Sequence, residues 1–405
     1  MNEILIIQER GFFMTLIYIM KICTNLGGTE RVLSDKMNYF AEIGYNVSLI
    51  TYSQGKHPLA FPLHENVKHY DLNTKFFELY KYGIIRRIYK HIKMRRLFKQ
   101  RLQELVERLN PDYMIATTYD LEIINLIGSI KTNANKFIES HIAFHKAQIT
   151  ENHNNGRITR LAAKLFNIYI LSQIKKFDRL ISLTEGDAKM WQNYIRNVSI
   201  IPNPVTYYPE SISEELSKKS TRIICVGRLT EQKGFDLLIE AFALISEQCP
   251  EWHIDIFGKG KDELFLKEMI TKKHLDDRIK INKPTKSIYD EYQKSAFYVL
   301  SSRYEGFGIV LNEAMSCGLP CVSFDCKYGP SEAICHGKNG LLVENGNTAQ
   351  LGEAILWMIQ HPAERYQMKI HARMSSAKYK KEIIMKKWIQ LFEESIRNKS
   401  NQVKL

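Results

Sequence analysis

The sequence is poor in cysteine and contains no long apolar run. Its seven cysteines are an odd number without C-x-x-C spacing. We interpret Cys225, Cys317, Cys321 and Cys326, which lie in apolar or strand-like stretches, as reduced core thiols of a cytosolic protein. No apolar run approaches the roughly 18–20 residues that a membrane-spanning helix needs. The sequence therefore predicts no such helix.

The composition excludes two further classes of protein. A hydrophobic share of 44% and a charged share of 25% are typical of globular proteins, not of disordered or fibrous ones. With 405 residues, the chain is long enough for two domains that each bury a core. Residues 14–20 read as a first strand, and charged residues interrupt the apolar stretch before it. We therefore expect residues 1–13 to be an extension, with Met14 as a possible start.

Acidic residues are absent from residues 81–101, where nine basic residues alternate with apolar ones. The whole chain carries a formal net charge of +13. This pattern predicts a basic amphipathic helix of the type that lies on anionic lipid. A solvated helix with one face on the domain core remains an alternative. Nucleic acid is disfavoured as a partner, because no recognition motif or aromatic stacking set accompanies the charge.

The first half of the chain alternates strands with helices, as a Rossmann-like domain does. A Gly-Gly turn opens the first helix, and the backbone N–H groups at Gly28 can receive a phosphate there. Further strands are expected at residues 113–117, 136–138 and 179–183. His141 follows the second of these; a lone histidine is more often structural than catalytic, and His145 is a weaker candidate. Thr184, three residues before Asp187, is expected to cap a helix.

The second half begins after a proline-containing, polar segment that ends near residue 220 and is typical of an interdomain linker. A strand at residues 222–226 runs into a glycine-flanked loop that carries Arg228 and Lys233. The planar fork of an arginine and the point charge of a lysine both suit phosphate oxygens. Either residue alone would be read as surface charge near a turn, so the phosphate-binding prediction depends on a second motif at residues 301–320.

Residues 301–320 are the most informative stretch. A strand ends in a loop with Glu305, Gly306, Phe307 and Gly308, and a helix with Glu313 comes next before Gly-Leu-Pro terminates it. Such a loop and helix start lie at the carboxyl edge of a parallel sheet, where open α/β sheets bind ligands. The glycines let the backbone approach a ligand, and the helix N-terminus offers N–H groups to an anion.

The Glu-x7-Glu spacing of Glu305 and Glu313, with Gly-Leu-Pro-Cys-Val after it, resembles the retaining nucleotide-sugar glycosyltransferases of family 4. The likeness is greatest to bacterial enzymes that build surface polysaccharides and lipid-linked oligosaccharides. It covers nearly the whole chain, strongly in the second half and weakly at residues 71–110. The resemblance implies an α/β fold of the GT-B type, with two Rossmann-like domains facing each other across a cleft. Residues 1–202 would form the acceptor-side domain, residues 203–378 the nucleotide-sugar domain, and residues 379–405 a C-terminal helix that returns to the first domain.

The resemblance also implies roles for single residues. Glu305 would approach the donor-sugar hydroxyls or an oxocarbenium-like centre, and Glu313 would hold the ribose hydroxyls, because an ionised carboxylate can accept from two vicinal hydroxyls. His141 would lie beside the reacting sugar. The donor would also contact Gly28, Arg228, Lys233, Gly306, Phe307 and Gly308. The sequence has no D-x-D metal clamp, so we expect no metal and no other cofactor, with Arg228 and Lys233 replacing the metal.

The expected reaction moves a hexose or N-acetylhexosamine from a nucleotide sugar, a UDP-sugar for preference, to a glycan or polyprenyl-diphosphate-linked acceptor. The protein would work in the cytoplasm, peripherally on the inner face of the plasma membrane. Two alternatives share the architecture: a UDP-sugar epimerase, and a nucleotide-sugar-binding protein without catalysis. Nucleoside diphosphate release that requires an acceptor separates a transferase from both.

Overall fold

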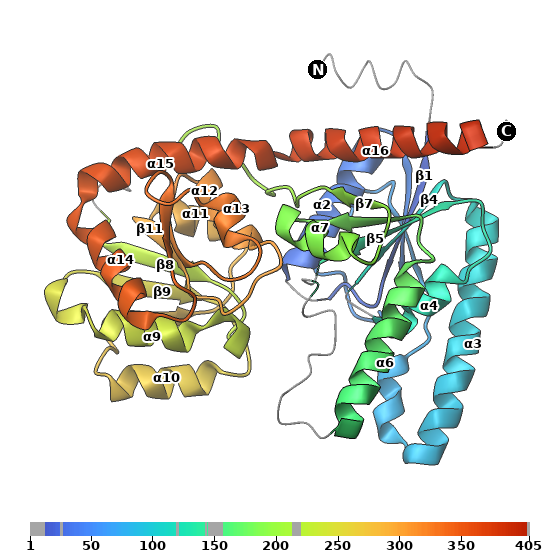
Figure 1. The fold of residues 1–405 in the computed structure, drawn as a ribbon, viewed down its shortest axis with the longest axis horizontal. Coiled ribbons are helices and arrows are strands. Elements are labelled where there is room, and N and C mark those ends of the chain that lie inside the picture. Colours follow the sequence, from blue (N-terminus) through green and yellow to red (C-terminus); the bar gives the residue numbers. More distant parts are fainter. Residues whose placement is uncertain are drawn as a thin grey trace. The chain divides into compact units, whose positions relative to one another are not determined.

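The computed structural model describes residues 13–24, 27–118, 121–141, 144, 157–212 and 220–402. His145, residues 1–12 of the expected N-terminal extension and residues 213–219 of the expected linker lie outside these ranges. The chain divides into two compact units, Met1–Ile201 with Met385–Leu405, and Pro202–Ile384. Each unit has a parallel sheet between helices, so the expected GT-B type of α/β fold is confirmed (Figure 1).

The first unit contains a seven-stranded parallel sheet in the order β3-β2-β1-β4-β5-β6-β7. Its strands are β1 (Thr15–Met20), β2 (Asn46–Thr51), β3 (Lys68–Asp71), β4 (Tyr113–Thr117), β5 (Asn135–Ser140), β6 (Arg179–Ser182) and β7 (Val198–Ile200). The predicted strands at residues 14–20, 113–117 and 179–183 are confirmed within a residue. β5 is longer than the predicted 136–138, because Glu139 and Ser140 continue the parallel pairing with β6.

Helices cover both faces of this sheet. They are α2 (Gly28–Glu42), η1 (Phe76–Lys81), α3 (Ile84–Leu109), α4 (Leu121–Gly128), α6 (Arg157–Ile174), α7 (Glu185–Gln192) and α16 (Lys381–Gln402). The predicted basic helix at residues 81–101 is confirmed as α3, which begins three residues later, at Ile84, and continues to Leu109. It begins later because its N-cap residue Gly83 is in extended conformation. The Thr184 side chain accepts a hydrogen bond from the Asp187 backbone N–H, as predicted.

The C-terminal helix α16 is part of the first unit's core. The Phe392 ring lies 4.4 Å from the Tyr113 ring of β4 and 5.6 Å from the Phe40 ring of α2, measured between centroids. α2 and α16 therefore share one face of the sheet. Apolar side chains of α3, α4 and α6 pack in a cluster with Ile17, Ile19 and Ile138 of the sheet. The predicted return of the C-terminal helix to the first domain is confirmed.

The second unit contains a six-stranded parallel sheet in the order β10-β9-β8-β11-β12-β13. Its strands are β8 (Arg222–Val226), β9 (His253–Phe257), β10 (Ile279–Asn282), β11 (Phe297–Leu300), β12 (Cys321–Phe324) and β13 (Gly340–Val343). Its helices are η2 (Glu231–Lys233), α9 (Phe235–Ala243), η3 (Ser246–Gln248), α10 (Glu263–Lys272), α11 (Ile288–Gln293), α12 (Ile309–Ser316), α13 (Pro330–Ala333), α14 (Thr348–Gln360), α15 (Pro362–Ser376) and η4 (Ala377–Tyr379).

The strand order of the second sheet reverses between β8 and β11. Loops that leave two neighbouring strands at such a switch point run in opposite directions and leave a crevice for a ligand. The loops after β8 and β11 are the ones that carry Lys233 and Glu305. The interiors of these strands are apolar, and the buried cysteines include all four that the sequence assigned to the core.

Candidate active site

Two loops of the second unit are joined at the switch point. The Arg303 N–H donates to the Gln232 carbonyl at 2.8 Å, and the Ser301 hydroxyl donates to the Lys233 carbonyl at 3.0 Å. Gly234 has φ +61°, and a Cβ there would collide with the Ser301 carbonyl oxygen. Only glycine allows this approach, so the loop after β8 is held in register with the loop after β11.

Lys233 and Glu305 meet where these loops touch. The Lys233 Nζ lies 2.6 Å from Glu305 Oε1, and the Ser302 hydroxyl donates to the same oxygen at 2.7 Å. The side chains of Lys233 and Glu305 are 13% and 6% exposed. Within the described part of the chain, both contacts use Oε1, which leaves Oε2 for another donor.

A second ion pair braces the same loops, and sequence reasoning missed it. Arg303 makes two hydrogen bonds to the Asp236 carboxylate, at 2.8 and 2.6 Å, and its guanidinium also donates to the Glu231 carbonyl. Burial raises the pKa of Asp236, but the hydrogen bonds and charge of Arg303 outweigh it and lower that pKa overall. Arg303 thus connects the loop after β11 to the start of α9. Its position between Ser301 and Glu305, inside the most informative stretch of the sequence, was the one signal that could have identified it.

The helix α12 begins immediately after the Glu305 loop. Its N-cap residue Gly308 has φ +65°, a left-handed conformation that favours glycine. The first backbone N–H groups of α12 have no intrahelical partner, so they can receive a negative charge. Phe307 is buried, and its ring packs edge-on against the Tyr379 ring, with the two ring centroids 5.6 Å apart. This packing anchors the turn between Glu305 and α12.

Glu313 and Arg228 flank this centre. Glu313 lies buried in α12, and the Tyr289 hydroxyl donates to its Oε1 at 3.3 Å. Arg228 is exposed on the loop after β8, where its Nη2 donates to Gln232 Oε1 at 3.1 Å. The structure therefore brings Lys233, Glu305 and Gly306–Gly308 together. Arg228 lies on the same loop as Lys233, and Glu313 lies in α12, the helix that follows Gly308.

The remaining two candidates belong to the first unit. Gly28 is the first residue of α2 and is exposed, while the Glu30 carboxylate folds back against Gly27. His141 follows β5, and its Nε2 lies 3.0 Å from Glu139 Oε2. The Glu139 carboxylate also pairs with Lys36 of α2 at 2.6 Å. Sequence reasoning missed this buried pair.

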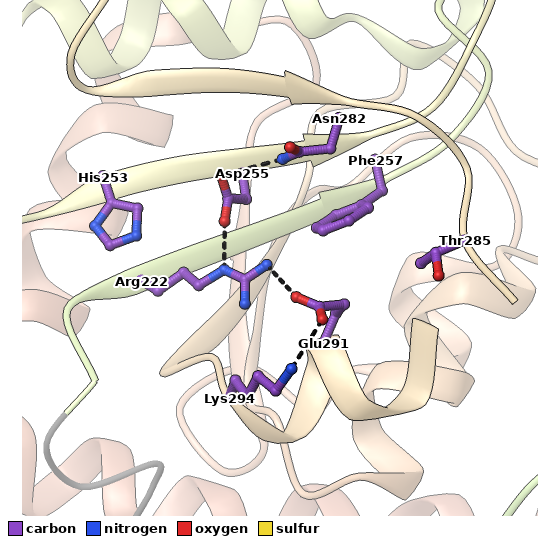
Figure 2. Close-up of a pocket in the computed structure, with 8 residues that line it drawn as sticks. All are labelled: Arg222, His253, Asp255, Phe257, Asn282, Thr285, Glu291 and Lys294. Atoms are coloured by element: carbon purple, nitrogen blue, oxygen red, sulfur yellow. Dashed lines mark hydrogen bonds and ion pairs between the residues drawn. The ribbon is translucent and has the colours of Figure 1, made fainter. Parts of the chain in front are cut away.

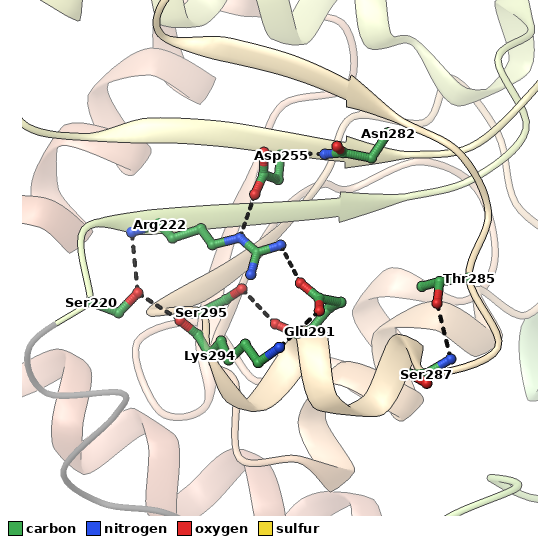
Figure 3. Close-up of polar contacts among 9 residues, drawn as sticks. All are labelled: Ser220, Arg222, Asp255, Asn282, Thr285, Ser287, Glu291, Lys294 and Ser295. Atoms are coloured by element: carbon green, nitrogen blue, oxygen red, sulfur yellow. Dashed lines mark hydrogen bonds and ion pairs between the residues drawn. The ribbon is translucent and has the colours of Figure 1, made fainter.

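A cavity of about 520 Å³ in the second unit is lined by none of the predicted site residues (Figure 2). It lies between β8, β9, β10 and α11, and Figure 2 shows Arg222 at its centre. The Arg222 guanidinium pairs with Asp255 at 2.5 Å and with Glu291 at 2.7 Å. Lys294 adds a 3.0 Å contact to Glu291 (Figure 3). Two cations face two carboxylates, so the cavity offers no unpaired charge for a phosphate, and we interpret it as structural.

This interpretation predicts a stability defect without a donor-binding defect. Arg222→Met leaves Asp255 and Glu291 without their shared cation, so we expect the second unit to lose about 2–3 kcal/mol of unfolding free energy. Lys294→Met is the matched control, because Lys294 is 55% exposed and touches the same carboxylate. Urea unfolding and donor KM of both variants test the expectation. A large rise in donor KM for Arg222→Met alone would contradict it.

Among the described residues, no group of three or more His, Cys, Asp or Glu side chains is placed to hold a metal ion. None of the helices in the described ranges is long and apolar enough to cross a membrane.

Known proteins resemble the chain over most of its length. A family model described as "Glycosyl transferases group 1" matches residues 209–380. An uncharacterized glycosyltransferase of Haemophilus influenzae is 29% identical over 384 residues, which cover 94% of this chain and 99% of that protein. The amylovoran biosynthesis glycosyltransferase AmsD of Erwinia amylovora is 26% identical over 388 residues, 92% of this chain and 98% of that protein.

A solved structure extends the likeness to the fold. A TarM mutant of S. aureus, in complex with Fondaparinux, alpha-GlcNAc-glycerol and UDP, superposes with a TM-score of 0.73 at 18% identity. The match covers 94% of this chain and 99% of TarM. Residues 209–380 therefore resemble the group 1 glycosyl transferases, and the chain is a glycosyltransferase with the two-domain GT-B fold.

Proposed function

We propose that this enzyme is a retaining, metal-independent transferase of the family 4 type. It moves a hexose or N-acetylhexosamine from a UDP-sugar to a glycan or lipid-linked glycan in bacterial surface polysaccharide biosynthesis. The observation that carries the proposal is the Lys233–Glu305 pair, 2.6 Å apart, beside the N-terminus of α12. AmsD, by its name, serves amylovoran biosynthesis, and TarM was crystallised with UDP; both support the proposal.

In this proposal the donor diphosphate binds across the two joined loops. Lys233 has three N–H donors and uses one on Glu305, so it can also donate to phosphate oxygens. Arg228, exposed on the same loop, can add a two-pronged contact. The N–H groups at the start of α12 supply further donors. These fixed charges stabilise UDP as negative charge develops on the departing phosphate.

Glu305 and Glu313 hold the two ends of the donor. Glu305 Oε2 accepts from a donor-sugar hydroxyl, while Lys233 and Ser302 hold the carboxylate through Oε1. Glu313, oriented by the Tyr289 hydroxyl, accepts from the ribose hydroxyls. During transfer the bond between sugar C1 and the phosphate oxygen breaks, and its electrons leave with UDP. The acceptor oxygen bonds to C1 on the same face, and its proton passes to the departing phosphate.

A donor screen in EDTA tests this proposal. UDP-, GDP- and ADP-sugars are offered to the purified protein, and thermal shift and nucleotide release are measured with and without acceptor glycans. Glu305→Ala should bind UDP but lose at least about 10²-fold in transfer rate, since it lacks the group that faces the sugar. Glu353→Ala is the matched control, because Glu353 is exposed on α14.

Each result of the screen has a defined meaning. Acceptor-dependent UDP release in EDTA that Glu305→Ala abolishes supports a metal-independent transferase. Turnover that needs a divalent cation contradicts the roles proposed for Arg228 and Lys233. Sugar interconversion without an acceptor would instead indicate an epimerase, and donor binding without turnover would indicate a binding protein.

We also propose that the first unit docks on an anionic membrane, on the cytoplasmic face, where it meets a polyprenyl-diphosphate-linked acceptor. The start of α3 leaves Ile84 80% exposed and Ile85 86% exposed, beside the exposed basic residues Arg86 and Arg87. Large apolar side chains next to basic ones suit the interface of an anionic bilayer. α6 adds exposed apolar side chains: Leu161, Leu165, Phe166, Ile168 and Tyr169.

Charge reversal tests the docking surface on α3. Arg86, Arg87, Lys93 and Arg96 are exposed, so their replacement by glutamate should release the protein from phosphatidylglycerol vesicles in a sedimentation assay. Arg95 is spared, because it donates to Asn125 of α4 at 2.8 Å and its loss would disturb packing. Four exposed lysines elsewhere on the chain, reversed together, provide the control. Unchanged vesicle binding of the α3 variant would rule out this surface.

A further inference from the structure

Gln232 belongs to the loop after β8, and its side chain reaches the loop after β11. Its Oε1 accepts a hydrogen bond from Arg228 Nη2 at 3.1 Å, and its Nε2 donates to the Tyr304 carbonyl at 3.2 Å. The Gln232 backbone carbonyl accepts from the Arg303 N–H at 2.8 Å. Gln232 therefore joins the two loops of the candidate site and holds Arg228 to them.

The chemistry of its two neighbours fixes how the Gln232 amide is oriented. A guanidinium group only donates hydrogen bonds, and a backbone carbonyl only accepts them. The amide oxygen must therefore face Arg228, and the amide nitrogen must face Tyr304. Flipping the amide would bring donor against donor and acceptor against acceptor. The Gln232 side chain, which is partly buried, thus has a single arrangement that satisfies both neighbours.

Arg228 is held differently from Lys233, the other cation predicted to bind the donor. Lys233 pairs with the Glu305 carboxylate at 2.6 Å, which offsets part of its positive charge. The Gln232 amide is neutral, so it orients the Arg228 guanidinium without reducing its charge. The contact involves Nη2 of a group that has five N–H donors, so a fork of other donors can bind an anion.

The exposure of Arg228 gives this contact a consequence for binding. A long exposed side chain samples many rotamers, and ordering it when a ligand arrives lowers the affinity. The hydrogen bond to Gln232 restricts Arg228 before the ligand arrives. Part of the ordering cost is then met during folding instead of during binding, which is the effect of preorganisation.

We propose that Gln232 is a positioning residue that preorganises Arg228 for the donor diphosphate. The inference rests on the proposed function, in which Arg228 binds phosphate oxygens beside Lys233. Gln232 acts through Arg228, and its hydrogen bond to Tyr304 keeps this cation in register with the neighbouring Glu305. A neutral acceptor at this position lets the full charge of Arg228 act on the diphosphate.

A double-mutant cycle with UDP tests whether Gln232 acts through Arg228. Gln232→Met removes both side-chain hydrogen bonds, and we expect it to raise the Kd for UDP about tenfold with little change in melting temperature. In the Arg228→Met background the same substitution should raise the Kd by less than about twofold, because the residue that it positions is absent. Gln248→Met is the matched control, since Gln248 is an exposed glutamine in η3 of the same unit. An equally large rise in both backgrounds would overturn the inference.

Gln232→Glu tests the importance of a neutral acceptor. This variant keeps an acceptor for Arg228 but adds a negative charge close to the diphosphate. We expect a larger rise in the Kd for UDP than Gln232→Met causes, and a rise that shrinks as salt is added. UDP binding as tight as in the unmodified enzyme would contradict the inference.

A measurement on the unmodified enzyme does not depend on how a variant folds. ¹⁵N relaxation of labelled arginine side chains reports the order of each guanidinium group, and Arg228→Met identifies one resonance by its loss. We expect Arg228 to be clearly more ordered than the exposed Arg196 before UDP is added. Equal mobility of the two side chains would show that Arg228 is not preorganised and would overturn the inference.

Arg228→Met separates this inference from the proposed function. If Arg228→Met binds UDP as tightly as the unmodified enzyme, the role of Arg228 in the proposed function is wrong, and the inference falls with it. If Arg228→Met binds UDP weakly while Gln232→Met binds it normally, only the inference is wrong. Weak binding by both single variants, with normal melting temperatures and little further loss in the double variant, supports the two together.

Discussion

Lys233→Ala should lower kcat/KM for the sugar donor by about 10²–10³-fold, the range seen when one preorganised donor to a developing negative charge is removed. In the proposed mechanism Lys233 is the cation held closest to Glu305, 2.6 Å from its Oε1. Because its charge is needed most as the phosphate departs, the loss should fall mainly on kcat. Glu305 keeps its contact to Ser302 in this variant, so the fold should survive.

Calorimetric titration with UDP in EDTA and steady-state kinetics together measure this effect. Lys261→Ala is the matched control, since Lys261 is an exposed lysine in the turn after β9 of the same unit. If Lys233→Ala binds UDP and turns over normally, the diphosphate does not lie on this loop. The double variant Lys233→Ala/Glu305→Ala should be little slower than the slower single variant, because residues that act as a unit are not additive.

Most of the correct predictions came from patterns among residues that are close together in the sequence. The stretch from residue 301 to residue 320 contains its strand end, glycine turn, helix and terminator in order, and α12 with its N-cap Gly308 agrees with that reading. The Thr184 cap was predictable for the same reason, since donor and acceptor are three residues apart. Such features depend on neighbours in the chain, and the sequence displays them directly.

Contacts between distant residues were not predictable in this way. Arg303 and Asp236 are 67 residues apart, and Lys36 and Glu139 are 103 residues apart. No spacing rule connects such pairs before the sheet order is known. One signal was available: Lys36 lies four residues after Val32 and four before Phe40, on the buried stripe of α2. A lysine on an apolar stripe indicates a buried partner, but only the fold identifies it as Glu139.

Lys36→Met should lower the unfolding free energy of the first unit by about 3–5 kcal/mol at pH 7, because removing one member of a buried pair leaves an uncompensated charge. The double variant Lys36→Met/Glu139→Leu should recover most of this loss, since it buries no charge. Hydrogen exchange of β5 peptides, followed by mass spectrometry, measures local opening of this unit. Peptides from the second unit provide the internal control.

The pH dependence of this loss distinguishes a charge effect from a packing effect. In the unmodified enzyme the pKa of Glu139 is held at about 2, below its unfolded value of about 4.3. The ionised Glu139 therefore adds to the unfolding free energy above pH 4.3, and this stabilisation is lost as the pH falls toward 2. In Lys36→Met the burial of Glu139 loses its main opposing charge, so we expect the pKa to rise above the unfolded value. In this variant the protonated Glu139 is compatible with the folded state at low pH, and the unfolding free energy falls as the pH rises through the raised pKa. The stability difference between the two proteins should therefore be largest near pH 7 and shrink toward pH 4. A difference that stays constant over this range would mean that Lys36 acts through packing against the Trp388 ring of α16, whose centroid lies 3.9 Å from its Nζ, instead of through its charge.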